Sequence, residues 1–425
     1  SAQDFSLQAD TLNEARLPAQ WDLQSCIDYA LEQNITIRKN RVTAESTQID
    51  VKTAKAALFP SLSFSTSQQV LNRPYQETSS RVSGSEIISS NSKTSYNGNY
   101  GLNASWTIYN GSKRLKTLKQ ERLNNQVAEL DVATSENTIK ESIAQIYIQI
   151  LYAAESVRVN ENTLQVSIAQ RDRGQELLNA GSIAKSDFAQ LEAQVSTDRY
   201  QLVTAQATLQ DYKLQLKQLL ELDGENEMNV YLPKLSDENV LAPLPAKKDV
   251  YVSALAIRPE IEASKLNVEA SELGIDIAKS SYFPTISLSA GIGTNHTSGS
   301  DFTFGEQVKN GWNNSIGLSV SVPIFNNRQT KSAVQKAKLQ RETNMLSLLD
   351  EQKALYKTIE SLWLDANSAQ QRYAAANEKL RSTQISYDLI SEQFNLGMKN
   401  TVELLTEKNN LLQAQQEQLQ AKYMA

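Results

Sequence analysis

The residue types that carry most enzyme chemistry are scarce in this chain. The one histidine, His296, lies among Thr, Ser and Gly in a predicted surface loop, and the one cysteine, Cys26, lies in a predicted helix over 21–31. The sequence contains no His/Cys metal-ligand spacing, no Ser/His/Asp set and no phosphate-cradling Gly loop. Paired acids such as Asp131 and Glu136 fall on predicted long helices, where a solvated face explains them. We therefore predict a protein that is not an enzyme and that has no cofactor and no metal site.

Charged residues also lie close to two glycines that we predict to be tight turns. The first segment, 179–187, reads NAGSIAKSD, and the second, 394–403, reads FNLGMKNTVE. A glycine in each segment can take the left-handed conformation that ends a helix. Lys399 and Glu403 are four residues apart, a spacing that also fits an ordinary solvated pair worth a few tenths of a kcal/mol.

The elements that would hold these turns are unusually long. Only 15 Gly and 9 Pro occur in 425 residues. Between Gly111 and Leu178 the one breaker is Gly174, so a helix there could extend on the order of 100 Å. After Gly181 comes an apolar seam with the three-four spacing of helices packed lengthwise, interrupted only by Asp198. The seam consists of Phe188, Leu191, Val195, Leu202, Ala205, Leu209, Tyr212, Leu216 and Leu219.

The chain states this pattern twice. Phe59-Pro60 recurs as Phe283-Pro284, 224 residues later, inside two similar stretches, 34–60 and 258–284. Two further landmarks recur 216 residues later: Asn110 as Asn326, and Gly181 as Gly397. We predict two tandem repeats, over 1–230 and 249–425, joined by a Pro-rich linker over 231–248. In the second repeat the long helices are expected over 327–394 and 401–423.

Each repeat also contains two segments in which apolar residues alternate with Ser, Thr, Asn or Gly. We predict strands at about 60–70, 99–109, 284–294 and 314–325, with polar loops over 72–97 and 294–310. Their length suits tilted strands that cross an outer membrane, with aromatic residues near the strand ends. No run approaches the ~20 apolar residues of a membrane-spanning helix, so any crossing would use these strands.

Four strands cannot close on themselves, and an open edge in lipid leaves backbone groups unpaired. Closure therefore requires several copies, and three copies would supply twelve strands. The fold class predicted is mainly α with transmembrane β: tandem repeats of helix, β-hairpin and long antiparallel helix pair, trimerising into a 12-strand β-barrel continued by an α-helical barrel.

A different class of protein explains the long helices equally well. A soluble periplasmic coiled-coil scaffold or adaptor would have the same seams, with two ordinary hairpins at its end. Net charge −6 and a pI near 5.3 argue against a nucleic-acid partner for either class. Ser1 could follow a cleaved signal peptide.

The order of these elements, duplicated across nearly the whole chain, resembles the TolC-like outer-membrane efflux family. Three short segments carry the resemblance: 23–34 looks like the family's opening helix, LFPSL at 58–62 its entry into the first strand, and VPIFN at 322–326 its exit from the last. The resemblance implies a passive, homotrimeric exit duct in the bacterial outer membrane, in contact with outer-membrane lipid and extended into the periplasm. It also implies docking of a periplasmic adaptor (membrane fusion) protein and an inner-membrane transporter, as in tripartite efflux or type I secretion.

The resemblance further implies sites at the hairpin tips. Adaptor docking would involve Gly181, Ser182, Gly397 and Met398. Carried over by position, a periplasmic gate would be formed by Ser186, Asp187, Phe394, Lys399 and Glu403. Lys399 would be the basic partner of Ser186 and Asp187, and Glu403 would supply an acidic ring. The chain departs from the family pattern at Lys399, where Arg is expected, at Phe394, where Tyr is expected, and at Thr406, where a second Asp is expected.

Overall fold

The computed structural model describes residues 17–77, 79–90, 92–223 and 227–425. They form two compact units, each built from separate stretches of chain. The helical unit contains the residues up to Val42, Leu130–Ile261 and Asp350–Ala425; the sheet unit contains Thr43–Glu129 and Glu262–Leu349. Both units take segments from both predicted repeats, so the division into repeats remains a prediction from sequence.

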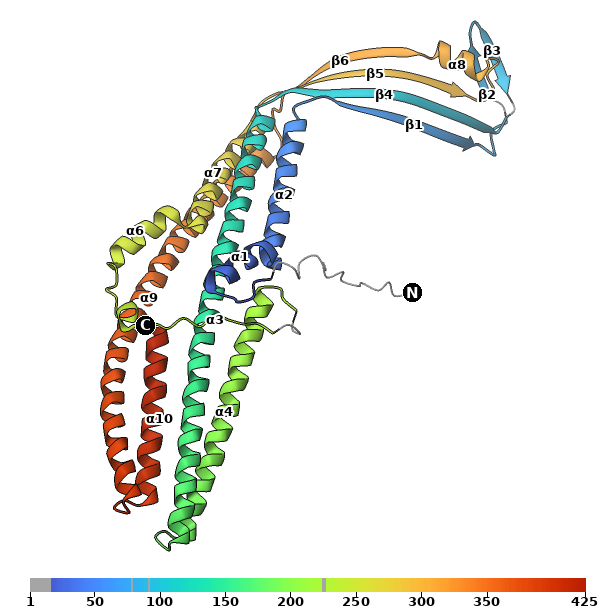
Figure 1. The fold of residues 1–425 in the computed structure, drawn as a ribbon. Helices are drawn as coiled ribbons and strands as arrows, with labels where there is room; N and C mark the ends of the chain where they lie inside the picture. Colours follow the sequence, from blue (N-terminus) through green and yellow to red (C-terminus); the bar gives the residue numbers. More distant parts are fainter. Residues whose placement is uncertain (1–16, 78, 91, 224–226) are drawn as a thin grey trace. The chain divides into compact units, whose positions relative to one another are not determined.

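The sheet unit has a four-stranded antiparallel sheet with the order β1-β4-β5-β6 (Figure 1). Alternation of apolar and small polar residues predicted all four strands. They are β1 (Ser61–Asn72), β4 (Thr94–Asn110), β5 (Thr285–Thr297) and β6 (Asn313–Ser321). The strand predicted to run to residue 325 ends at Ser321, because Pro323 has no backbone N–H to donate to a ladder. The central β4–β5 pairing joins the two halves of the sequence.

Strand register places the apolar residues on one face. Leu102 lies opposite Phe64 on one side and opposite Ile292 on the other, and Leu288 lies opposite Leu318. Side chains alternate across a strand, so Ser, Asn and Gly occupy the other face. The apolar face is open: Phe64 is 66% exposed and Leu318 is 64% exposed.

The two segments predicted as polar loops contain regular structure. A hairpin of β2 (Ser79–Ser83) and β3 (Glu86–Ser90) lies in the first, and α8 (Phe304–Asn310) lies in the second and packs on β5. His296, predicted in a surface loop, instead belongs to β5 and is half-buried. Its ring stacks on Tyr100 and meets Phe304 edge-on, with ring centres 5.8 Å and 4.9 Å apart. Aromatic packing therefore orders this part of the chain.

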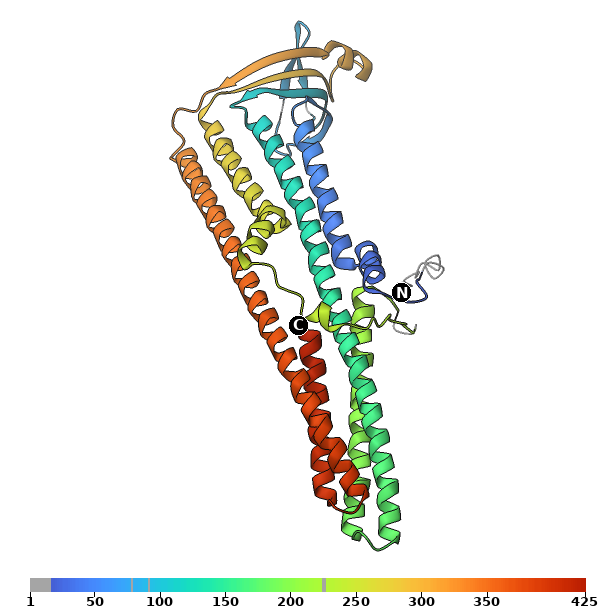
Figure 2. The same cartoon turned by 60° about the vertical axis from the view of Figure 1, so that its left-hand side comes forward.

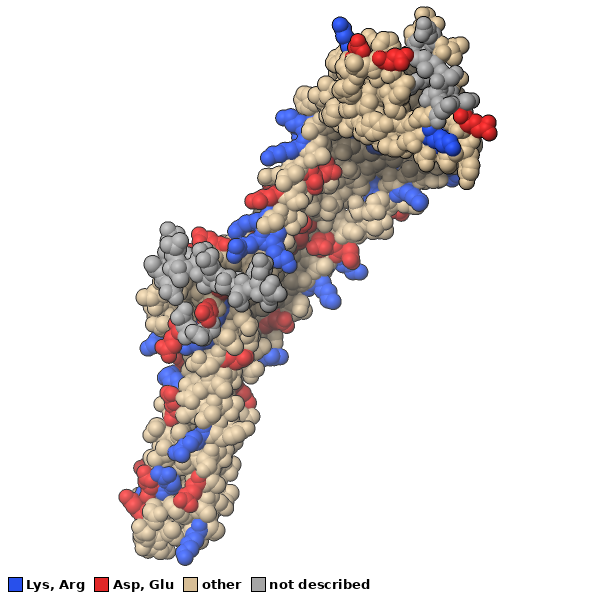
Figure 3. All heavy atoms as spheres, turned by 90° about the vertical axis from the view of Figure 1, so that its right-hand side faces the viewer, with Lys and Arg blue, Asp and Glu red and all other residues tan. Residues whose placement is uncertain are grey.

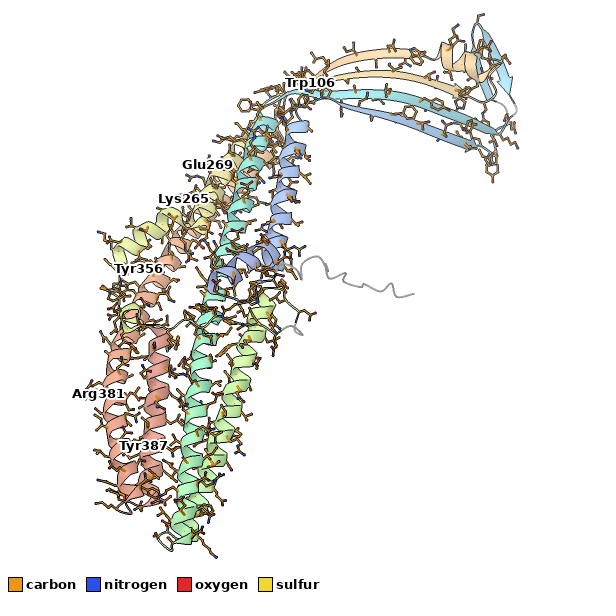
Figure 4. The ribbon with its side chains drawn as sticks, viewed as in Figure 1. Trp106, Lys265, Glu269, Tyr356, Arg381 and Tyr387 are labelled. Carbon is orange, nitrogen blue, oxygen red and sulfur yellow. The ribbon has the colours of Figure 1, made fainter. Side chains whose placement is uncertain are left out.

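Helices continue from the strands. α2 (Ile35–Ala56) leads into β1, α3 (Lys113–Asn179) follows β4, α7 (Pro259–Lys279) leads through the short helix η2 (Ser280–Tyr282) into β5, and α9 (Gln329–Asn395) follows β6. At 67 residues each, α3 and α9 confirm the predicted long helices. At the start of β4's helix connection, Trp106 donates from Nε1 to the Leu58 carbonyl at 2.9 Å (Figure 4).

The helical unit contains two antiparallel helix pairs, which both views show side by side (Figures 1 and 2). Hairpin 1 is the part of α3 in this unit with α4 (Lys185–Leu219), and hairpin 2 is the part of α9 in this unit with α10 (Thr401–Met424). The unit also holds α1 (Leu23–Gln33), α5 (Asp237–Val240) and α6 (Lys247–Ile257). No helix in the described part of the chain carries a stretch apolar and long enough to span a bilayer.

The main core of the helical unit lies where α1 packs on hairpin 1. Cys26, Ile143, Ile150, Leu216 and Leu220 are completely buried there. Residue 21 lies outside the helix predicted over 21–31: Trp21 forms a parallel bridge to Val230. This core fixes the base of hairpin 1, and the opposite end of each hairpin is a turn.

Candidate functional site at the hairpin tips

Both tips have the same backbone geometry. Gly181 has φ +71° and Gly397 has φ +74°, the left-handed conformation predicted for them. In hairpin 1 the N–H of Ser182 donates to the Leu177 carbonyl at 2.8 Å; in hairpin 2 the N–H of Met398 donates to the Gln393 carbonyl, also at 2.8 Å. These bonds make a Schellman motif at each helix end. The two motifs are 216 residues apart, as the predicted repeat requires.

An acidic residue closes the helix that follows each turn. Glu403 accepts from the Asn400 N–H at 3.2 Å, and the Asn400 side chain accepts from the Glu403 N–H at 2.9 Å, which is a complete capping box. Asp187 accepts from the Ala184 N–H at 3.4 Å, but alanine has no side chain to return the bond. Asp187 and Glu403 are therefore equivalent in the two repeats, and hairpin 1 has the weaker cap.

The predicted gate residues are all near the turns, with different surroundings. Lys399 lies 3.3 Å from Glu403, and neither Ser186 nor Asp187 is its hydrogen-bond partner among the described contacts. The bond from the Asn400 N–H, followed by that from Lys399, lowers the pKa of Glu403. Phe394 is 3% exposed, so it is a packing residue of hairpin 2 in this structure. The network of Lys399 with Ser186 and Asp187 stays a prediction.

Sequence reasoning missed two bonds that join the hairpins near their tips. Arg173 on α3 donates to the Asn395 carbonyl at the end of α9 at 3.3 Å, where the helix dipole favours a cation. Gln170, one turn away on α3, donates to the Tyr387 hydroxyl at 2.8 Å (Figure 4). Burial raises the pKa of Tyr387. Both donors are on polar positions of a long helix, a pattern that does not separate them from solvated residues.

A third connection lies deeper between the hairpins. The Asp198 carboxylate on α4 forms an ion pair with Lys408 on α10 and accepts from the Ser167 hydroxyl on α3. The side chains of Asp198 and Lys408 are 2% and 3% exposed. Burial lowers the pKa of Lys408, and the bond to Asp198 opposes that shift. The interruption of the apolar seam at Asp198 was the sequence signal for this layer, but its partner could not be read from it.

These groups can position helices but offer little for catalysis. Among the described residues, no cluster of His, Cys, Asp and Glu could hold a metal ion. Figure 3 shows acidic and basic side chains interspersed near the tips, not gathered by sign. The contacts that join the hairpins are hydrogen bonds and ion pairs between helices, which suits a site that holds or changes an arrangement.

The sequence model of the Outer membrane efflux protein family matches residues 26–221 and 250–425, and the chain belongs to this family. Outer membrane efflux protein BepC of Brucella suis is 26% identical over 290 residues, covering 68% of this chain and 60% of the relative. Outer membrane protein TolC of Escherichia coli is 24% identical over 336 residues, covering 76% of this chain and 66% of the relative. The chain thus spans less than two thirds of the length of these two relatives.

Solved structures have the same fold at lower identity. CusC superimposes with a TM-score of 0.79 at 20% identity, over 94% of this chain and 88% of that one. VceC of Vibrio cholerae superimposes with a TM-score of 0.77 at 16% identity, over 95% and 93%. These likenesses confirm the predicted arrangement of helices and strands.

Proposed function

We propose that this protein is a passive exit duct of the bacterial outer membrane, with its helical part in the periplasm. The observation that carries the proposal is the sheet with one exposed apolar face and one polar face. In water such a face would be an aggregation hazard, whereas lipid covers it at no cost in hydrogen bonds. Membership of the efflux family supports the same conclusion. The soluble scaffold alternative offers no reason for Ile316, Leu318 and Val320 to be 78%, 64% and 57% exposed.

The duct is proposed to be a homotrimer. β1 and β6 are the outer strands of the sheet, each with one edge that has no partner strand in the described chain. Apolar side chains are also exposed on helices of the sheet unit: Ile49 on α2 is 60% exposed, and Leu346 and Leu349 on α9 are 59% and 60% exposed. Pairing of β1 in one copy with β6 in the next, together with contact of these helix faces, would satisfy both.

A periplasmic adaptor and an inner-membrane transporter are the proposed partners. Leu396 and Met398 at the tip of hairpin 2 are 69% and 70% exposed, and a methionine adapts readily to a partner surface. Gly181, Ser182, Gly397 and Met398 are the proposed docking positions. Relatives are named for different cargoes, among them a toxin and drug export protein and a pyoverdine export protein. No cargo is assigned to this chain.

The experiment is extraction, sizing and conductance of the whole protein. We expect it to require detergent, to have the mass of three chains by light scattering, and to conduct in planar bilayers. Leu318→Asp should reduce the yield of conducting protein, since a charge on a lipid-facing position costs about 2–4 kcal/mol. Ser319→Asp on the opposite face is the matched control. A monomer that stays soluble without detergent would refute the proposal.

We further propose that Ser186, Asp187, Phe394, Lys399 and Glu403 form a periplasmic gate. What supports it is their position at the two turns and the carboxylate of Glu403, which its cap and Lys399 keep ionised. Single-channel recording of Glu403→Ala, with and without divalent cations, tests the gate. We expect a change in conductance and weaker block by divalent cations; unchanged values would remove the assignment.

A further inference from the structure

The buried layer of Ser167, Asp198 and Lys408 has more polar bonds than an ordinary contact between helices. Three groups on three helices converge on one carboxylate: the Ser167 hydroxyl, the Lys408 ammonium, and Gln194 Nε2 at 3.0 Å from Asp198 Oδ1. Beside it, Gln194 lies 3.4 Å from Asn409 Oδ1 across the α4–α10 contact. Asp198 therefore has its acceptors filled, as a buried charge requires.

Stability does not by itself explain this layer. Taking a carboxylate and an ammonium out of water is costly, and apolar side chains of similar volume often stabilise a protein as well or better. A buried polar residue in a helix seam is instead known to determine which helices pair and in what register. The layer is thus better suited to choosing a partner than to adding stability.

The two repeats carry different residues at the positions of this layer. The counterpart of Asp198, 216 residues later, is Ala414, and the counterpart of Lys408, 216 residues earlier, is Glu192. Ala414 is 1% exposed and Glu192 is exposed. The turns of the two hairpins are alike, so backbone geometry does not tell one hairpin from the other, whereas these four residues do.

The consequences for pairing follow from the charges. When the α4 face of hairpin 1 meets the α10 face of hairpin 2, Asp198 finds Lys408. Two copies of hairpin 1 packed in the same way would bring Asp198 against Glu192, a repulsion between two acids. Two copies of hairpin 2 would leave Lys408 against Ala414, a buried charge with no partner. Both like pairings are therefore penalised.

We propose that the Ser167–Asp198–Lys408 layer is a pairing-specificity element that makes hairpin 1 accept hairpin 2 and reject a second hairpin 1. The competing hairpins come from other copies, so this part of the inference rests on the proposed self-association. The layer would ensure that unlike hairpins alternate when copies assemble.

Disulfide trapping in the full chain tests this element, with Cys26→Ala in all versions. Gln194→Cys with Asn409→Cys in one chain reports pairing of hairpin 1 with hairpin 2. Gln194→Cys in one tagged copy, co-expressed with Ala193→Cys in another, reports pairing of two hairpins 1, because Ala193 is the repeat counterpart of Asn409. With the native layer we expect only the first disulfide.

The decisive variant replaces both charges, Asp198→Leu with Lys408→Met, so that no unpaired charge is buried. We expect the disulfide between two hairpins 1 to rise several-fold relative to that between unlike hairpins. The exchanged pair, Asp198→Lys with Lys408→Asp, should return the native pattern. The exposed ion pair Lys379–Glu417, 2.7 Å apart on hairpin 2, provides the control, since Lys379→Met with Glu417→Leu should change nothing.

An unchanged ratio of disulfides in the doubly apolar variant would overturn the inference. Light scattering on the same samples separates this result from a failure of the proposed function. If every version is monomeric, self-association is refuted, and the yield of the Gln194–Asn409 disulfide then decides. A several-fold lower yield in the apolar variant, restored by the exchanged pair, supports the pairing role; equal yields refute it.

Discussion

Arg173 provides a direct test of whether bonds between the hairpins hold the proposed duct closed. Its guanidinium bonds the Asn395 carbonyl at 3.3 Å but also pairs with Glu176 at 2.8 Å, and its side chain is 43% exposed. A shielded hydrogen bond to a charged group contributes about 1.5–3 kcal/mol. Exposure and competition with Glu176 reduce this to about 0.5–1 kcal/mol. Arg173→Ala should therefore shift the ratio of closed to open tips about two- to five-fold per copy.

If three copies open together, the free energies add to ~1.5–3 kcal/mol, a shift on the order of ten- to a hundred-fold in the closed-to-open ratio. The assay is open probability in single-channel recordings. Arg171→Ala is the matched control, because Arg171 lies on the same helix and pairs with the adjacent Asp172 at 3.0 Å. Arg173→Lys should lie between the wild type and Arg173→Ala. An open probability for Arg173→Ala equal to that of Arg171→Ala would refute the reasoning.

Three further predictions concern stability. Gly397→Ala should cost about 1–2 kcal/mol from its positive φ alone, since nothing lies within 4 Å of the added Cβ, whereas Gly305→Ala, also in open space, should not; thermal unfolding followed by circular dichroism compares them. Gly98→Ala should cost about 1–3 kcal/mol because the new Cβ would lie 2.1 Å from His296 Cε1, and His296→Ala in the same chain should recover most of that; additive losses would contradict the packing. Burial raises the pKa of Cys26 and of Tyr147 to about 12, so above pH ~9 the unfolded state binds fewer protons and stability should fall as pH rises toward 12; Cys26→Ala should reduce that slope in denaturant titrations.

The fold could be predicted from sequence because its signals are periodic. Alternation along 99–109 specified β4, and the spacing from Phe188 to Leu219 specified α4, without knowledge of distant contacts. Pro323 shows the limit of the method: alternation continued past it, and the missing N–H ended the strand first. His296 was misplaced because a polar composition hides aromatic packing contributed by Tyr100 and Phe304, which are remote or follow in a short helix.

The candidate site was less predictable, because its bonds join residues far apart in the chain. The turns at Gly181 and Gly397 were found from local pattern alone. Asp198 stood out as a charge in an apolar seam, but Lys408, 210 residues away, could be identified only in three dimensions. Arg173 carried no signal, since an exposed arginine on a long helix is ordinary until its carbonyl partner is seen.

The Schellman motifs at the two tips have a consequence for how recognition can evolve. The N–H groups of Gly181, Ser182, Gly397 and Met398 are all bonded to carbonyls of their own helices. A protein that meets these turns therefore finds no strand edge to extend and must recognise side chains. Residues around the glycines can then change with little effect on folding, provided that the glycines stay. A single scaffold can in this way acquire new binding specificities by substitution at a few positions.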